Sequence, residues 1–177
     1  MQIYLLRHGE TNFNKEKRMS GNDDAQLNET GIKQAETASI SLQTIHYDFI
    51  LSSPYRRALK TAEIANKSKS PIIIDDRLRE RAAGILEGKL LAEIDLDAFY
   101  DYNKNAEYEG AENIQDFSER VWGFLDESQE SYRDKTILLV THNIVIRAIK
   151  AYIIGIPDDG NIRKYGIKNG TIEAYTL

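Results

Sequence analysis

The segment Leu5-Leu6-Arg7-His8-Gly9-Glu10-Thr11 decides the fold of this chain, because in it a short apolar run ends in a polar turn. The apolar residues Ile3 to Leu6 predict a buried strand, and Gly9 lets the backbone turn after it. The chain holds only 3 histidines, and a second one, His142, follows another apolar run at 137–141. Two scarce histidines at strand ends suggest one shared site. A histidine beside an arginine can attack a phosphorus atom while the guanidinium holds the phosphoryl oxygens. Taken alone, however, the tripeptide more often marks a strand that ends in a basic turn.

The composition narrows the class of protein. A length of 177 residues predicts one domain over 1–177 with a substantial core. The net charge of -5 argues against a nucleic-acid binder, so an anionic substrate needs a local cationic pocket. There are 0 cysteines, which excludes disulfides and thiolate chemistry and is typical of a cytoplasmic protein. No signal peptide and no membrane-spanning stretch are expected, so neither nucleic acid nor a membrane is an expected partner.

Apolar runs alternate with amphipathic segments along the chain, which predicts an α/β fold: a three-layer sandwich with a mostly parallel central sheet between helices. Strands are expected at 2–6, 49–51, 72–74 and 136–141. Helices are expected from Asn28, from Ser53 as N-cap with Pro54 at the first helical position, from Asn113, and at 143–154. The apolar stripe of the first of these helices is expected to comprise Ile32, Ala35, Ala38 and Leu42. A small insert or lid is expected at about 76–112, with a short helix near 90–99. The turn at 168–171 predicts a hairpin between two final strands.

On this plan, three separate segments deliver unusual side chains to one edge of the sheet. Arg7 and His8 end the first strand, Arg57 lies in the first turn after the second, and His142 ends a later one. Ligands of open α/β sheets bind at the carboxyl ends of the strands, and helix N-termini there favour anions. Two histidines and two arginines at this edge match a phosphoryl group. One neutral histidine would attack, and the other, if protonated, would supply charge and a hydrogen-bond donor.

The motifs resemble those of the histidine phosphatase superfamily, the phosphoglycerate mutase-like proteins, over nearly the whole chain, and together they are highly specific. The matching segments are Leu6–Thr11 with Asn14, Leu27–Ala35, Ser52–Ala58 with Thr61-Ala62, Leu78–Glu80 with Gly84, Glu87 and Gly88, and Val140–His142 with Ile146-Arg147.

The resemblance implies a role for each matched residue. His8 would be the nucleophile, and Glu80 would protonate the leaving oxygen and later activate water. The phosphate pocket would comprise Arg7, Arg57 and His142, with Asn14 assisting. Ser20 and Gly21 would offer further substrate contacts. No metal or other cofactor is implied, because the arginines supply the positive charge.

One residue departs from the family pattern inside the site. Asn143 stands where glycine usually follows the second histidine. If its backbone amide donates to phosphate, asparagine can adopt the required geometry, since it tolerates left-handed conformations.

Three functions stay open at this stage. The leading hypothesis is a phosphomonoesterase that acts on a small phosphate ester, and the second is a phosphoglycerate mutase-type phosphotransferase. A mutase must hold a second anion, yet only Lys89 and Lys104 are basic between 89 and 119. The third hypothesis is a non-catalytic module that binds a phosphate ligand. A zinc site on His8 and His142 would need a third ligand from elsewhere. Neither the natural ester nor the choice between monomer and homodimer follows from the sequence.

Overall fold

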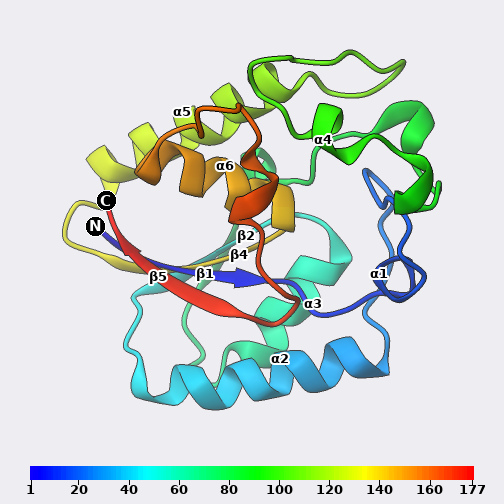
Figure 1. Ribbon diagram of the computed structural model, residues 1–177. Helices are drawn as coiled ribbons and strands as arrows, with labels where there is room; N and C mark the ends of the chain where they lie inside the picture. Colours follow the sequence, from blue (N-terminus) through cyan, green and yellow to red (C-terminus); the bar gives the residue numbers. More distant parts are fainter.

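A five-stranded sheet in the order β3-β2-β4-β1-β5 forms the centre of the computed structural model, which describes residues 1–177 (Figure 1). The parallel strands are β1 (Gln2–Arg7), β2 (Phe49–Ser52), β3 (Ile72–Ile74) and β4 (Thr136–Thr141). The edge strand β5 (Ile172–Thr176) runs antiparallel to β1. The predicted mostly parallel sheet is therefore confirmed, and β1 and β4 lie side by side at its centre.

Helices cover both faces of the sheet, as predicted for a three-layer sandwich. One face carries α2 (Glu29–Ser41) and α3 (Arg56–Ala65), and the other carries α5 (Ile114–Ser131) and α6 (Asn143–Ile154) (Figure 1). The strands serve both layers because successive side chains point to opposite faces. Leu5 and Leu139 pack in the cluster of α5 and α6, whereas their neighbours Leu6, Leu138 and Val140 pack in the cluster of α2 and α3. No helix combines the length and the apolarity needed to cross a lipid bilayer.

Three local predictions were wrong. The helix after β2 begins at Arg56 with Tyr55 as its N-cap residue, while the Ser53 hydroxyl, two residues before it, accepts from the Tyr55 amide at 3.3 Å and also contacts His142 Nε2. Ile32 lies on α2 but is 39% exposed, so it is outside the buried stripe. The turn at 168–171 leads from a 3₁₀ helix, Ile162–Tyr165, to the single strand β5 rather than joining two strands.

The insert at 76–112 consists of short elements anchored by one buried arginine. It contains 3₁₀ helices at Asp76–Leu78, Gly84–Leu86 and Leu91–Glu93, followed by the single-turn helix α4 (Leu96–Phe99). Arg81 is 2% exposed and donates from Nε to the Glu112 carbonyl and from Nη1 to the Phe99 carbonyl, each at 2.7 Å. These two hydrogen bonds connect the first part of the insert to α4 and to the last residue of the insert.

The loop after β1 is fixed by a close approach between two backbones. A Cβ atom on Gly9 would collide with the Gly31 carbonyl, and one on Gly31 would collide with the Glu10 carbonyl. The Glu10 amide donates to Gln34 Oε1 at 2.8 Å, and the Gly9 amide donates to Thr61 Oγ1 at 3.0 Å. The first turn of α2 and the side of α3 therefore hold the backbone that carries His8.

Two helical glycines test this packing. We expect Gly31→Ala to lower the free energy of unfolding by about 1–3 kcal/mol, because the new methyl group overlaps the Glu10 backbone. Gly123→Ala in α5 is the matched control, since a Cβ there meets nothing within 4 Å. It should raise the free energy of unfolding by about 0.5–1 kcal/mol through helix propensity. Urea unfolding measures both values, and equal effects of the two substitutions would contradict the proposed close approach.

Candidate active site

The carboxyl ends of β1 and β4 bring His8 and His142 together. Their ring centroids lie 5.2 Å apart in an edge-to-face arrangement, and the residues are 3% and 0% exposed. Both histidines come directly after neighbouring parallel strands, β1 and β4, whose last residues, Arg7 and Thr141, pair with each other. The prediction that the two scarce histidines lie at one place is therefore confirmed.

His8 is held as a neutral ring with one nitrogen free. Its Nδ1 lies 2.7 Å from the Gly9 carbonyl oxygen, which can only accept, so Nδ1 carries the proton. The lone pair is then on Nε2, which makes no hydrogen bond within the protein. Burial lowers the pKa of His8 well below its ordinary value, and the charges of Arg57 and Arg7 lower it further. His8 therefore has the protonation state of a nucleophile at neutral pH.

His142 is also neutral, with its proton on the opposite nitrogen. Arg57 Nε donates to His142 Nδ1 at 3.2 Å, so Nδ1 must accept. His142 Nε2 then donates to Ser53 Oγ at 2.7 Å. Burial lowers the pKa of His142 well below its ordinary value, followed by the charges of Arg57 and of His8. In the ligand-free protein, therefore, the condition attached to the predicted role of His142, that the ring be protonated, is not met. Ser53, which orients this ring, was missed because its motif also fits a helix cap.

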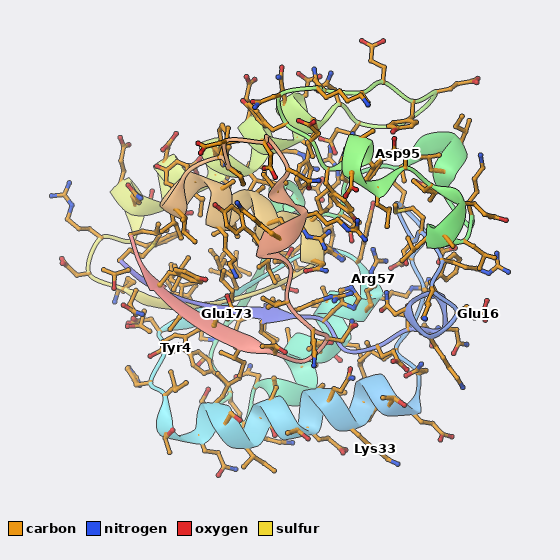
Figure 2. All side chains as sticks on the ribbon, in the orientation of Figure 1. Tyr4, Glu16, Lys33, Arg57, Asp95 and Glu173 are labelled. Atoms are coloured by element: carbon orange, nitrogen blue, oxygen red, sulfur yellow. The ribbon has the colours of Figure 1, made fainter.

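Arg57 is fully buried and comes from the first turn of α3 (Figure 2). Besides His142, its guanidinium donates to the carbonyl oxygens of Gly21 and Asp23. These contacts use three of its five N–H groups. Two N–H groups are left, enough for a bidentate contact with an anion. Gly21 thus supports Arg57 through its carbonyl oxygen, a role that the sequence did not suggest.

A pocket of about 200 Å³ lies in front of these buried groups. Six of the nine predicted site residues line it: Arg7, Asn14, Ser20, Gly21, Glu80 and Asn143. The other three, His8, Arg57 and His142, are not part of its wall and lie beneath it. Asn14 Oδ1 accepts from the Thr11 amide and from Asn169 Nδ2, while Asn14 Nδ2 makes no hydrogen bond and can donate to a ligand.

Asn143 fits the site by a different geometry from the one expected. It is the first residue of α6 and is not among the residues with positive φ, so no left-handed conformation is needed. Its Oδ1 accepts from the Ile167 amide at 2.9 Å. The amides of the first turn of α6 stay without intrahelical partners, and His142 provides no side-chain cap. This helix end therefore favours an anion.

Glu80 is the only carboxylate in the pocket wall. Its Oε1 accepts from the Arg81 amide at 3.3 Å, and its Oε2 lies 3.8 Å from His142 Nδ1. Burial raises the pKa of Glu80, although Arg57 and Arg7 act in the opposite direction. A carboxyl group with a raised pKa can carry a proton and donate it.

Five arginines face this single carboxylate. They come from five places in the chain: Arg7, Arg18, Arg81, Arg147 and Arg163. The number of basic residues between 89 and 119 therefore understates the positive charge of the pocket, because all five arginines come from other segments. Arg147 was identified only as part of the motif around His142; its spacing of four residues from Asn143, which places both on one helix face, is the signal that it also lines the pocket. No group of three or more histidine, aspartate or glutamate side chains is placed to hold a metal ion.

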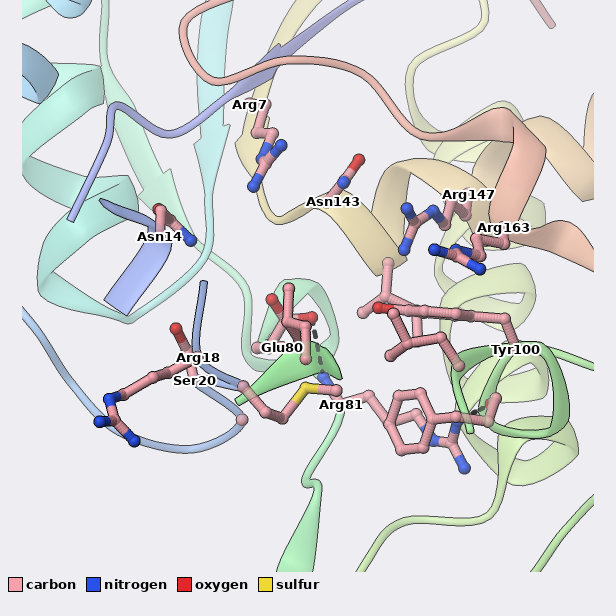
Figure 3. Close-up of a pocket in the computed structure, with 16 residues that line it drawn as sticks. Arg7, Asn14, Arg18, Ser20, Glu80, Arg81, Tyr100, Asn143, Arg147 and Arg163 are labelled. Atoms are coloured by element: carbon pink, nitrogen blue, oxygen red, sulfur yellow. Dashed lines mark hydrogen bonds between the residues drawn. The ribbon is translucent and has the colours of Figure 1, made fainter. Parts of the chain in front are cut away.

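Figure 3 shows how the labelled residues divide the pocket. In this view Glu80 lies between Arg7 and Asn14 on one side and Tyr100, Arg147 and Arg163 on the other. One part of the site thus contains His8, His142, Arg7 and Arg57, and the other part contains the further arginines Arg147 and Arg163. Such an arrangement can hold a phosphoryl group at its base and an alcohol residue above it.

The chain is similar to known proteins in both sequence and structure. Phosphoserine phosphatase 1 of Hydrogenobacter thermophilus is 30% identical over 97% of this chain and 84% of the relative. A Salmonella choleraesuis protein named "Probable phosphoglycerate mutase GpmB" is 31% identical over 89% of this chain and 76% of the relative. The crystal structure of the alpha-ribazole phosphatase from Shigella flexneri has a TM-score of 0.83 at 28% identity, covering 98% of this chain and 89% of that one.

A family model also matches nearly the whole chain. The model of the histidine phosphatase superfamily, branch 1, covers residues 3–177, which include all of the predicted site residues. The resemblance inferred from the motifs is thereby confirmed, and the chain belongs to the histidine phosphatase superfamily.

Proposed function

We propose that the protein hydrolyses a small phosphate monoester through a phosphohistidine intermediate on His8. The observation that carries the proposal is the hydrogen bond from His8 Nδ1 to the Gly9 carbonyl, which leaves Nε2 as a free nucleophile beside buried cations. Relatives named as phosphoserine phosphatase and alpha-ribazole phosphatase support the reaction class.

In the first half-reaction, the Nε2 lone pair of His8 attacks the phosphorus atom and forms a P–N bond. The P–O bond to the alcohol breaks, and the protonated carboxyl of Glu80 gives its proton to the leaving oxygen. Arg7 and the two remaining N–H groups of Arg57 stabilise the charge on the equatorial oxygens. Burial and the charges of Arg57 and Arg7 keep His142 neutral in the empty site, and the arriving dianion offsets those charges. His142 Nδ1 can then take a proton from solvent, in place of its hydrogen bond from Arg57 Nε, and donate it in a hydrogen bond to the phosphoryl group.

In the second half-reaction, the Glu80 carboxylate takes a proton from water. The water oxygen attacks phosphorus, the P–N bond breaks, and its electron pair returns to His8 Nε2. The products are inorganic phosphate, free His8 and protonated Glu80, so the site is restored. Asn14 Nδ2 and the first amides of α6 complete the shell around the phosphoryl group.

A phosphotransferase of the mutase type is the second candidate. The observation that favours it is the set of pocket arginines outside the phosphoryl shell, Arg18, Arg147 and Arg163. Labelled phosphoryl enzyme separates the two functions. Release of the label as inorganic phosphate in the presence of glycerate supports hydrolysis, whereas transfer to glycerate supports the mutase. A non-catalytic module would give neither product.

The first prediction is that the covalent label lies on His8. Rapid quench with ³²P-labelled substrate should trap a base-stable, acid-labile label on the peptide that contains His8. His8→Ala should abolish both label and turnover, and His142→Ala should slow labelling by about 100-fold, as for loss of one stabiliser of transition-state charge. His46→Ala is the control, because His46 is exposed and outside the site. Near-normal turnover in His8→Ala would point to direct attack by water instead.

The second prediction concerns the proton donor. A poor leaving group needs a proton, whereas a nitrophenolate does not. We therefore expect Glu80→Gln to lower kcat on an alkyl phosphate by about 100-fold or more, and on p-nitrophenyl phosphate far less. Equal losses on the two substrates would remove Glu80 from this role.

The third prediction is that activity does not depend on a metal ion. Positive charge in the site comes from Arg7 and Arg57, and no cluster of three acidic or histidine side chains lies within the fold. Hydrolysis of p-nitrophenyl phosphate should survive exhaustive dialysis against EDTA. Loss of activity that zinc or magnesium restores would refute the arginine-based mechanism.

A further inference from the structure

The turn at 167–170 reaches the candidate active site from the other end of the sequence. The Ile167 carbonyl accepts from Arg7 Nη1 at 2.7 Å, and the Ile167 amide donates to Asn143 Oδ1 at 2.9 Å. The Gly170 amide donates to the Arg7 carbonyl at 3.0 Å. One short segment therefore contacts two residues of the pocket wall, which come from β1 and from α6.

The backbone of this turn is itself fixed. The Thr171 amide donates to the Lys168 carbonyl at 3.2 Å and closes the turn. Gly170 has a φ of 70°, which favours glycine, and a Cβ there would lie 2.8 Å from the Gln34 Cβ on α2. The side chain of Asn169 thus extends from a backbone that is held on both sides.

Asn169 contacts two site residues through one amide nitrogen. Its Nδ2 donates to the His8 carbonyl at 2.9 Å and to Asn14 Oδ1 at 3.2 Å. A backbone carbonyl oxygen only accepts, so the group that faces His8 must be the NH₂ group. The two hydrogens of this group serve the two acceptors, and Asn169 itself is not part of the pocket wall.

Asn14 is oriented by these contacts. Its Oδ1 accepts from the Thr11 amide at 3.1 Å as well as from Asn169. Two donors therefore hold the oxygen of the Asn14 amide, and its nitrogen is the end without a hydrogen bond within the protein. Asn14 lies in the pocket wall (Figure 3), so this nitrogen is available to the phosphoryl group.

We propose that Asn169 is a positioning residue of the phosphoryl site and acts through Asn14. It holds Asn14 Oδ1 and so keeps Asn14 Nδ2 directed at the phosphoryl oxygens. This inference rests on the proposed phosphatase function, and it adds to that site a residue from a segment that the sequence predicts only as a turn. An Asn14 amide turned the other way would present its oxygen to the negatively charged phosphoryl group and repel it. A donor that is fixed before the reaction stabilises the transition state without reorganisation.

The first test is the substitution Asn169→Ala. It should lower kcat/KM by about 10-fold, in the range for loss of a hydrogen bond to a charged group. The loss should be equal on p-nitrophenyl phosphate and on an alkyl phosphate, because the phosphoryl group is common to both esters. An unchanged kcat/KM would contradict the proposal. A loss confined to the alkyl ester, the pattern expected of Glu80→Gln, would contradict it too.

A double-mutant cycle tests whether Asn169 acts through Asn14. Asn14→Ala should lower kcat/KM by about 10- to 100-fold. Addition of Asn169→Ala to this variant should lower kcat/KM further by less than about 2-fold, because no amide is left to orient. Losses that multiply in full would overturn the proposal and assign the effect to the His8 carbonyl contact or to the fold.

Asn66→Ala is the matched control. Asn66 is also half-buried, donates from Nδ2 to the Ser70 carbonyl at 2.8 Å and accepts from the Ser70 amide at 3.0 Å, but it lies outside the pocket wall. This substitution should lower the Tm and leave kcat/KM unchanged. A comparable loss of activity in Asn66→Ala would show that general destabilisation explains the effect. If Asn169→Ala does not fold, Asn169→Ser completes the same cycle with a smaller change of shape.

Binding of inorganic phosphate separates failure of this inference from failure of the proposed function. Titration calorimetry should show weaker phosphate binding to Asn169→Ala than to the wild-type protein, and no further weakening when Asn14→Ala is already present. If the wild-type protein is labelled on His8 and hydrolyses p-nitrophenyl phosphate while Asn169→Ala equals it in binding and turnover, the phosphatase mechanism stands and only the role of Asn169 is wrong. If the wild-type protein binds phosphate without turnover, the proposed function fails, and the cycle measured on phosphate affinity still decides the role of Asn169.

Discussion

The contact between Gly9 and Gly31 is the constraint on which the site depends. His8 needs a fixed ring orientation, and that orientation comes from the carbonyl of the next residue, Gly9. The Gly9 backbone is fixed in turn by Thr61 on α3 and by the first turn of α2. The His8 ring is therefore positioned by backbone packing against two helices rather than by a neighbouring side chain.

A second constraint is electrostatic. His8 and His142 are buried beside Arg7 and Arg57, so both rings are neutral and both have lowered pKa values. Four buried polar side-chain atoms lack a partner, and three of them belong to the pocket arginines Arg7, Arg81 and Arg147. The ligand-free pocket thus holds more donors than the protein can satisfy.

Much of this arrangement could be predicted from the sequence, because it follows from strand order. Residues at the ends of parallel strands must share one edge, so the meeting of His8 with His142 could be predicted from two apolar runs. Contacts that depend on long-range packing could not be predicted. Ser53 resembles a helix cap in the sequence, and its contact with His142 exists only in the folded protein. The expected hairpin partner of β5 does not exist, because β5 pairs with β1 from the other end of the chain. Arg18 and Arg163 were missed because their elements meet only in the folded pocket.

The helix α6 connects the buried His142 to the wall of the pocket. His142 precedes its first residue, and Arg147 follows about one turn later on the same rigid element. With a rise of about 1.5 Å per residue, their backbones are separated along the axis by on the order of 7 Å. The helix therefore fixes the spacing between the buried histidine and the arginine of the pocket wall, because both belong to one rigid element.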